Sequence, residues 1–118
     1  MRNLLVVDDD LVSLHAIAIF LESEGYDIKT ANNGNEAIEI LQLGTFDLVL
    51  SDITMPYGSG FDLLNYVRAT TPELPVLLMS GLIEIDCDEI KSRGAVNFLA
   101  KPVDFDDMLA KIVLALTL

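Results

Sequence analysis

The chain has 118 residues, a length that predicts one domain over residues 1–118 and leaves no room for a second of ordinary size. Apolar residues make up 52% of the sequence, which excludes a disordered chain, and 19 acidic against 7 basic residues give a formal charge of −12. A surface this acidic repels phosphate backbones and anionic lipid, so we expect neither nucleic acid nor a membrane surface as a direct partner. The apolar runs are too short to span a bilayer and the first residues lack a signal-peptide pattern, so we expect a cytoplasmic protein.

Two kinds of segment alternate along the chain. Short apolar runs are typical of buried strands, and the more polar run at 27–31 predicts a strand at the edge of the sheet. In chain order the predicted elements are strand 4–7, helix 11–23, strand 27–31, helix 35–43, strand 48–50, helix 60–69, strand 76–79, helix 83–92, strand 98–100 and helix 105–116. Strands separated by helices run parallel with right-handed crossovers, so the sequence predicts a three-layer, doubly wound α/β fold with helices on both faces.

Polar residues stand at the carboxyl ends of four predicted strands. They are Asp8-Asp9-Asp10, Ser51-Asp52, Ser80 and Lys101-Pro102. Because these ends open onto one edge of the sheet, we expect acids, a hydroxyl and an ammonium group to converge there. Carboxylate ligands with one lysine nearby suit Mg²⁺ better than a transition metal. A metal among carboxylates, with an ammonium group and a hydroxyl opposite, is typical of phosphoryl transfer in which a carboxylate attacks in line.

Some of these residues also have simpler interpretations. Asp52 taken alone is a solvated acid that caps a turn, and Lys101 taken alone is a surface lysine. Ser80 equally fits the N-cap of the fourth predicted helix, and Phe98 equally fits a plain core residue. Asp10 is expected to cap the first helix, so we assign it no chemistry.

Together the motifs resemble the response-regulator receiver domain, the phosphorylatable part of two-component signalling. The matching residues are Leu5-Val6-Val7-Asp8-Asp9, Asp52-Ile53-Thr54-Met55-Pro56 with Gly60 four residues on, Ser80, and Lys101-Pro102. The resemblance covers the chain from Leu4 to about Leu116. It implies a flavodoxin-like five-stranded parallel sheet in the order 2-1-3-4-5.

The resemblance implies a role for each acid at the expected site. Asp52 is expected to be the phosphoacceptor and, with Asp8, Asp9 and the backbone carbonyl of Thr54, to hold Mg²⁺ (or Mn²⁺). Asp9 is expected to bind the metal directly and Asp8 mostly through water.

The remaining site residues are expected to respond to the phosphoryl group. Lys101 would pair with it, and a cis peptide bond to Pro102 would aim the lysine inward. Ser80 would swing its hydroxyl onto the phosphoryl group, and the ring of Phe98 would turn inward into the vacated space.

The partners that the resemblance implies are a histidine kinase or histidine phosphotransfer protein, and an output domain or target protein. A homodimer through the fourth helix, fifth strand and fifth helix is a further expectation. Five apolar residues of the first helix are expected to cover the sheet: Val12, Ala16, Ile17, Phe20 and Leu21. Leu14 and Ala18 then remain for another face, where they are either docking residues for the kinase or ordinary scattered surface residues.

We expect a signalling switch that catalyses its own phosphorylation but is not an enzyme. Four other functions compete with this interpretation. A Mg²⁺-dependent phosphohydrolase with an aspartyl nucleophile usually has a second acid where this chain has Thr54. A flavin carrier or dinucleotide-binding domain needs a glycine-rich loop after the first strand, whereas Asp8-Asp9-Asp10 would repel a phosphate. A degenerate receiver that only binds a partner remains open, although every expected catalytic position is filled.

Overall fold

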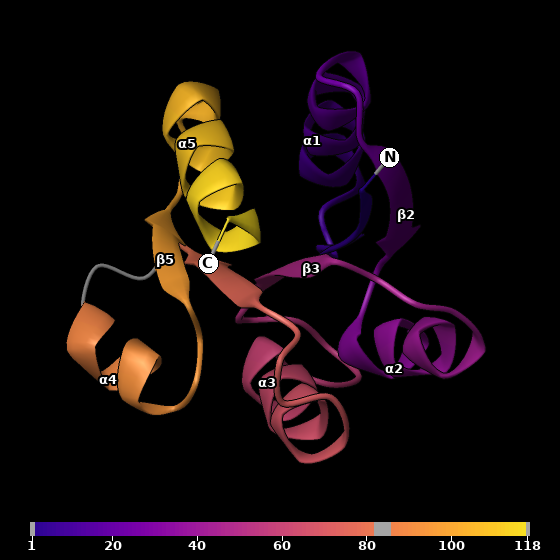
Figure 1. The fold of residues 1–118 in the computed structure, drawn as a ribbon, viewed down its shortest axis with the longest axis vertical. Coiled ribbons are helices and arrows are strands. Elements are labelled where there is room, and N and C mark those ends of the chain that lie inside the picture. Colours follow the sequence, from indigo (N-terminus) through magenta and orange to yellow (C-terminus); the bar gives the residue numbers. More distant parts are fainter. Residues whose placement is uncertain (1, 82–85, 118) are drawn as a thin grey trace.

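One sheet of parallel strands lies between two layers of helices (Figure 1). The computed structural model describes residues 2–81 and 86–117. The strands are β1 (Asn3–Val7), β2 (Asp27–Ala31), β3 (Leu48–Asp52), β4 (Val76–Ser80) and β5 (Asn97–Ala100). The helices are α1 (Leu11–Ser23), α2 (Gly34–Leu43), α3 (Gly60–Thr70), α4 (Cys87–Ser92) and α5 (Phe105–Leu116). Helices α1 and α5 cover one face, and α2, α3 and α4 cover the other.

The strand order is β2-β1-β3-β4-β5, and every neighbouring pair is parallel. The predicted fold class and the edge position of β2 are therefore confirmed. The register places Val7 of β1 opposite Ser51 of β3. Because the next residue along each strand is an aspartate, Asp8 and Asp52 reach the carboxyl edge of the sheet at the same level.

The three inner strands explain why the fold forms. Every residue of β3 and β4 is buried, and so are four of the five residues of β1, as expected for parallel strands covered on both faces. Alternate side chains point to opposite faces, so each strand contributes to two separate apolar cores. This packing holds the strand ends at fixed positions. The polar residues that directly follow the strands are therefore also held in place.

The prediction for α1 is right for Ile17 and Leu21, which are buried against the sheet, but wrong for other side chains. Leu14 and Ala18 are 3% and 8% exposed, whereas Val12 is 80% exposed. The buried positions follow the spacing i, i+3, i+4 and i+7 from Leu14 to Leu21. Because α1 is apolar on nearly every side, its sequence supports more than one such stripe. Leu14 and Ala18 are core residues, so the prediction that they are exposed docking residues is wrong.

The predicted fourth helix began at Ile83, which lies outside the described residues. Within them α4 begins at Cys87, and the side chain of Asp86 accepts the N–H of Asp88 as its N-cap. Ser80 therefore does not cap this helix, and that alternative is wrong.

Among the helices of residues 2–81 and 86–117, none is long and apolar enough to cross a membrane.

Candidate functional site

Three aspartates meet at the carboxyl edge of the sheet. Asp8 and Asp9 follow β1 directly, and Asp52 is the last residue of β3. One carboxylate oxygen from each lies within 4.8 Å of the others. Asp8 is fully buried and Asp52 is 7% exposed, whereas Asp9 is open to solvent. Two carboxylates are therefore held out of water beside a third, as the sequence predicts.

Lys101 brings the opposite charge into this group of acids. Its Nζ donates to Asp8 Oδ2 at 2.8 Å and to Asp52 Oδ2 at 3.1 Å. The lysine follows β5, its backbone N–H donates to the carbonyl of Ser80, and its peptide bond to Pro102 is cis, as the resemblance implies. One ammonium group thus faces three carboxylates, which leaves the site with a net negative charge.

The surroundings shift the pKa of both members of the Asp52–Lys101 pair upward. Burial raises the pKa of the Asp52 carboxyl, the hydrogen bond and charge of Lys101 oppose that effect, and the charges of Asp8 and Asp9 add to it. For Lys101, burial acts to lower the pKa, but the hydrogen bonds and charges of Asp8 and Asp52 together outweigh it and raise the pKa. The ammonium form of Lys101 is therefore favoured, and the carboxylate form of Asp52 is less favoured than in a carboxyl group exposed to water.

Asp10 holds Asp8 in place, a role that the sequence did not indicate. Its side chain accepts the N–H of Val12 at 3.0 Å and so caps α1, as predicted. Its own backbone N–H donates to Asp8 Oδ1 at 3.0 Å. Since Lys101 occupies the other oxygen, both oxygens of Asp8 are fixed. A backbone donor of this kind leaves no signal in the sequence.

Ser80 and Phe98 lie on the neighbouring strands β4 and β5. Ser80 ends β4 and is 2% exposed, and Phe98 in β5 is 9% exposed, with its ring among the core residues beneath α2, α3 and α4. The sequence also missed a link to α5, because Lys111 Nζ donates to the backbone carbonyl of Phe98 at 3.0 Å. Ser80 stands at the end of β4 as predicted, whereas Phe98 lies in the core opposite Leu78, two residues before that strand end. The movement of both residues on phosphorylation stays a prediction.

The loop after Asp52 carries the expected backbone ligand, Thr54, which is exposed. A hydrogen bond from Ile53 N–H to the carbonyl of Met79 fixes its start, and one from Gly60 N–H to the carbonyl of Ile53 fixes its end. The absence of a side chain at Gly60 lets α3 begin against β3, because a Cβ there would lie 2.8 Å from the Cα of Ile53. The donor set is made of oxygen atoms only and has excess negative charge, so it fits Mg²⁺.

A shallow apolar groove lies beside Lys101. It has a volume of about 200 Å³ and runs between α1 and the connection from β5 to α5. Val12, Ala16 and Phe105 contribute to its walls. The exposed side of α1 therefore continues up to the lysine of the acidic site.

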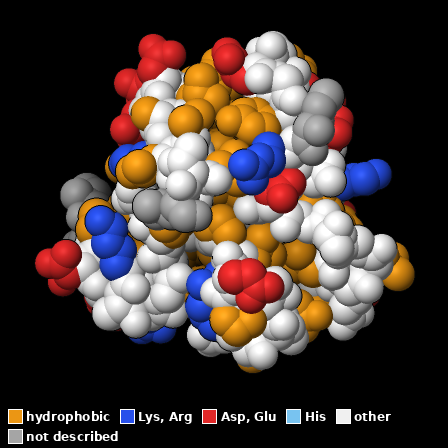
Figure 2. All heavy atoms as spheres, in the orientation of Figure 1, with side chains coloured by type: hydrophobic (Ala, Val, Ile, Leu, Met, Phe, Trp, Pro, Cys, Tyr) orange, Lys and Arg blue, Asp and Glu red, His pale blue; other side chains and the backbone are white. Residues whose placement is uncertain are grey.

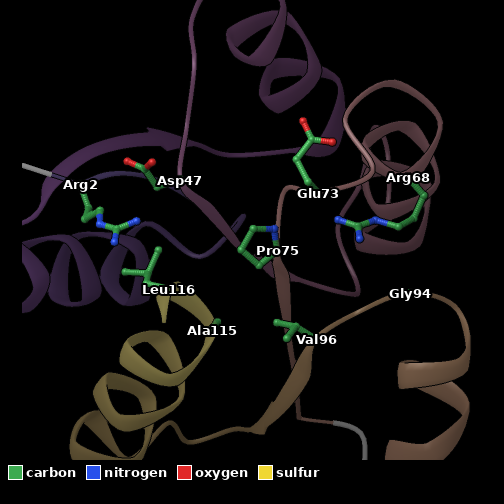
Figure 3. A pocket seen from close by; sticks show the side chains of 9 residues that line it. All are labelled: Arg2, Asp47, Arg68, Glu73, Pro75, Gly94, Val96, Ala115 and Leu116. Atoms are coloured by element: carbon green, nitrogen blue, oxygen red, sulfur yellow. The ribbon is translucent and has the colours of Figure 1, made fainter. Parts of the chain in front are cut away.

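A larger cavity, of about 450 Å³, lies at the opposite edge, where the strands begin. Figure 3 shows Arg2 next to Asp47 on one side of it and Arg68 on the other, with Glu73 above and Pro75 between. Burial lowers the pKa of Arg68, and the charge of Glu73 opposes that effect. Figure 2, which views this edge, shows basic and acidic side chains next to each other around an apolar centre.

The sequence model of the response regulator receiver domain matches residues 4–113 of the chain. The chain therefore belongs to the response-regulator receiver domain family. Receiver domains of this family act in two-component signalling, receive a phosphoryl group from histidine kinases, and typically bind Mg²⁺ at an acidic pocket. The acidic group at the carboxyl edge agrees with that function.

Curated relatives are longer regulators. The chain is 36% identical over 115 residues to the transcriptional regulatory protein ZraR of Escherichia coli K12, a match that covers 97% of this chain and 26% of ZraR. It is 32% identical over 112 residues to the cell cycle transcriptional regulator CtrA of Caulobacter vibrioides, covering 93% of this chain and 48% of CtrA. The receiver domain thus spans about a quarter of ZraR and about half of CtrA.

Solved structures share the fold over nearly the whole chain. The receiver domain of the Francisella response regulator 1452 matches with a TM-score of 0.92 and 27% identity, covering 99% of this chain and 98% of that one. Response regulator TrrA of Thermotoga maritima, solved with Mg²⁺ and BeF, matches with a TM-score of 0.89 and 30% identity, covering 98% and 99%.

Proposed function

We propose that this receiver domain, over residues 1–118, accepts a phosphoryl group on Asp52 from the phosphohistidine of a histidine kinase or phosphotransfer protein. An oxygen of Asp52 attacks the phosphorus, the new P–O bond forms as the P–N bond breaks, and the released imidazole nitrogen takes a proton from solvent. The observation that supports this assignment is the position of Asp52 beside Asp8 and Asp9, with its carboxylate oxygen 3.1 Å from Lys101 Nζ.

Asp8, Asp9, Asp52 and the carbonyl of Thr54 would hold Mg²⁺, which neutralises charge on the phosphoryl oxygens during transfer. Lys101 stabilises the same oxygens from the opposite side. Without such cations the ionised form of Asp52 is disfavoured by burial, as the raised pKa indicates. Mn²⁺ satisfies the same oxygen ligands and is a second metal for this site.

Phosphorylation is proposed to act as a switch and not to turn over a metabolite. Ser80 would turn its hydroxyl toward the phosphoryl group, and Phe98 would fill the space that Ser80 leaves. The phosphoryl group shifts the equilibrium between two conformations of this region, and an output domain or target protein responds to the result. A homodimer through α4, β5 and α5 is one form that such a response takes.

The kinase is proposed to dock on the exposed side of α1. Val12, Ala16 and Ile19 form an exposed stripe at helical spacing, with Val12 and Ile19 80% and 68% exposed. The stripe borders the apolar groove that reaches Lys101, so a helix bound there would bring its phosphohistidine to Asp52. These residues take the place of Leu14 and Ala18, which are buried.

The first experiment incubates the protein with acetyl phosphate and Mg²⁺ and measures its intact mass. We expect one added phosphoryl group on the wild type and on Asp47→Asn, an acid of the opposite edge, but none on Asp52→Asn or in EDTA. Continuous release of phosphate without an adduct would instead favour a phosphohydrolase. Absence of any modification, with a kinase as well, would leave a degenerate receiver that acts by binding.

The docking stripe is tested with a histidine kinase that phosphorylates the wild type. Val12→Asp and Ile19→Asp should slow transfer from the kinase while leaving the reaction with acetyl phosphate unchanged. Leu43→Asp is the matched control, because Leu43 is 89% exposed on α2, away from this stripe. Equal transfer to all three variants would contradict docking on α1.

A further inference from the structure

The loop between β3 and α3, residues 53–59, is held in its middle by another element. The backbone N–H of Gly34 donates to the carbonyl of Gly58 at 3.0 Å, and the N–H of Asn35 donates to the carbonyl of Tyr57 at 3.2 Å. Gly34 and Asn35 are the first two residues of α2. The first N–H groups of a helix have no partner within the helix, and here the β3–α3 loop supplies one for each.

The contact between α2 and the loop leaves no space for a side chain. A Cβ added to Gly34 would lie 2.6 Å from the carbonyl oxygen and 2.8 Å from the carbonyl carbon of Gly58. Both neighbours are backbone atoms, so they cannot rotate away as a flexible side chain would. Any side chain at Gly34 would therefore push the loop away from α2.

The loop needs such support because its backbone is strained. Tyr57 has a φ of 57°, in the left-handed region that costs free energy at a residue other than glycine, and Gly58 follows with a φ of 105°. The side chain of Tyr57 is 77% exposed, so burial of the ring does not hold this conformation. The hydrogen bonds from Asn35 to the carbonyl of Tyr57 and from Gly34 to the carbonyl of Gly58 hold the backbone of this turn.

We propose that the N-terminus of α2, through Gly34 and Asn35, positions the β3–α3 loop and so sets the affinity of the acidic site for Mg²⁺. The inference rests on the proposed function, in which Thr54 of this loop gives the metal a backbone carbonyl and Asp52 immediately precedes the loop. Thr54 lies between two fixed points, the hydrogen-bonded Ile53 and the contact of residues 57 and 58 with α2. A shift of the second point moves the Thr54 carbonyl relative to the carboxylates. Gly34 and Asn35 are positioning residues, since neither would touch the metal.

The test compares Gly34→Ala with Gly44→Ala, which change the two ends of the same helix. A Cβ at Gly44 has only a ring carbon of Phe46 within reach, at 3.9 Å, so this variant is the matched control. Metal affinity is measured directly with Mn²⁺ by counting the free ion in electron paramagnetic resonance spectra. The rate of phosphorylation by acetyl phosphate is then followed as a function of Mg²⁺ concentration.

We expect Gly34→Ala to bind Mn²⁺ about ten-fold more weakly, the lower range for loss of an outer-shell partner of a metal site. Its phosphorylation rate at saturating Mg²⁺ should stay within about two-fold of wild type, because only the position of the metal ligand changes. Mn²⁺ affinity equal to that of Gly44→Ala would overturn the inference, and so would a lower maximal rate at unchanged affinity.

A second variant covers the case in which Gly34→Ala does not fold. Asn35→Pro removes the hydrogen bond to Tyr57, and proline is tolerated in the first turn of a helix. It should weaken Mn²⁺ binding in the same direction, and wild-type affinity in this variant would contradict the inference. Failure of the wild type itself to bind Mn²⁺ or to be phosphorylated would instead overturn the proposed function on which the inference rests.

Discussion

The two edges of the sheet place charge in opposite ways. At the edge where the strands begin, two arginines and two acids surround the 450 Å³ cavity, so its charges balance. At the edge where the strands end, three aspartates face one lysine, and Asp8 has no solvent exposure. The larger cavity is therefore the less reactive place. Unbalanced charge held out of water identifies the functional edge better than cavity size does.

Two charged residues of the amino edge, Arg68 and Asp47, have structural partners. Arg68 donates to the backbone carbonyls of Pro72 and Leu74, which closes the connection from α3 to β4. Asp47 accepts the N–H of Asn3 at 2.7 Å and so joins the starts of two strands. At the carboxyl edge, by contrast, the carboxylates of Asp8 and Asp52 share the one ammonium group of Lys101.

The largest expected effect comes from removing that ammonium group. Lys101→Met should slow phosphorylation by acetyl phosphate about a hundred-fold, since a donor to the developing negative charge is lost. The same change should tighten Mg²⁺ binding several-fold, because the carboxylates then have no competing cation. Time-resolved intact mass and titration calorimetry measure the two quantities, and their opposite directions are the signature of the site.

Arg68→Met is the matched change at the amino edge. It removes the donors to two backbone carbonyls, so we expect a loss of about 1–3 kcal/mol in the free energy of unfolding. The phosphorylation rate of the folded protein should not change. A slower rate in this variant would show that the two edges are coupled. It would contradict the assignment of a purely structural role to the amino edge.

Each edge of the sheet has a glycine that lies close to other groups. Gly60→Ala places a Cβ against the backbone of Asp52 and Ile53, and the overpacking should cost about 1–3 kcal/mol and impair phosphorylation as well. Gly94→Ala, at the amino edge, meets the flexible stem of Arg68 and has a φ of 107°. That variant should lose stability by denaturant unfolding yet be phosphorylated at the wild-type rate. Equal phosphorylation of both variants would contradict the assignment of function to one edge only.

A smaller effect follows from the raised pKa of Asp52. The folded state then binds its proton more tightly than the unfolded state, so ionisation of Asp52 costs stability as the pH rises from about 3.8 through the folded pKa. Asp52→Asn should therefore raise the melting temperature in EDTA at neutral pH by a few degrees, with about 1 kcal/mol giving roughly 4 °C. The gain should vanish well below pH 3.8, where the wild-type carboxyl is protonated in both states. Asp47→Asn, at the amino edge, should give no such gain, and a similar rise there would refute the interpretation.

The sequence was sufficient for the fold and most of the site because strand ends in a parallel sheet converge. Once Asp8, Asp52, Ser80 and Lys101 are each assigned to the end of an apolar run, the topology alone brings them together. The edge position of β2 follows from its polarity, whereas the strand order was predicted only from the resemblance to receiver domains. The convergence of the strand ends and the edge position of β2 depend on residue type and spacing, which a sequence displays directly.

Two features of the structure could not be predicted from residue type and spacing. The buried face of α1 was misassigned in part because nine of its thirteen residues are apolar, so hydrophobic spacing does not distinguish Leu14 from Val12. The contact of α2 with the β3–α3 loop joins backbone to backbone, and its one trace in the sequence is a glycine at residue 34, a common residue in turns.

The smallest expected effect concerns how each edge forms its turns. At the amino edge the positive φ angles belong to glycines, Gly25 and Gly94, whereas the carboxyl edge has Tyr57 at a φ of 57°. A left-handed conformation costs a residue other than glycine about 1–2 kcal/mol, and Tyr57→Gly removes this cost. Glycine also gives the unfolded chain more freedom, which lowers the free energy of unfolding by about 0.5–1 kcal/mol. We therefore expect a net gain of about 0.5–1 kcal/mol by denaturant unfolding. A net loss would mean that the exposed ring stabilises the loop by contacts of its own, and the strain at the functional edge would then be compensated within the folded protein.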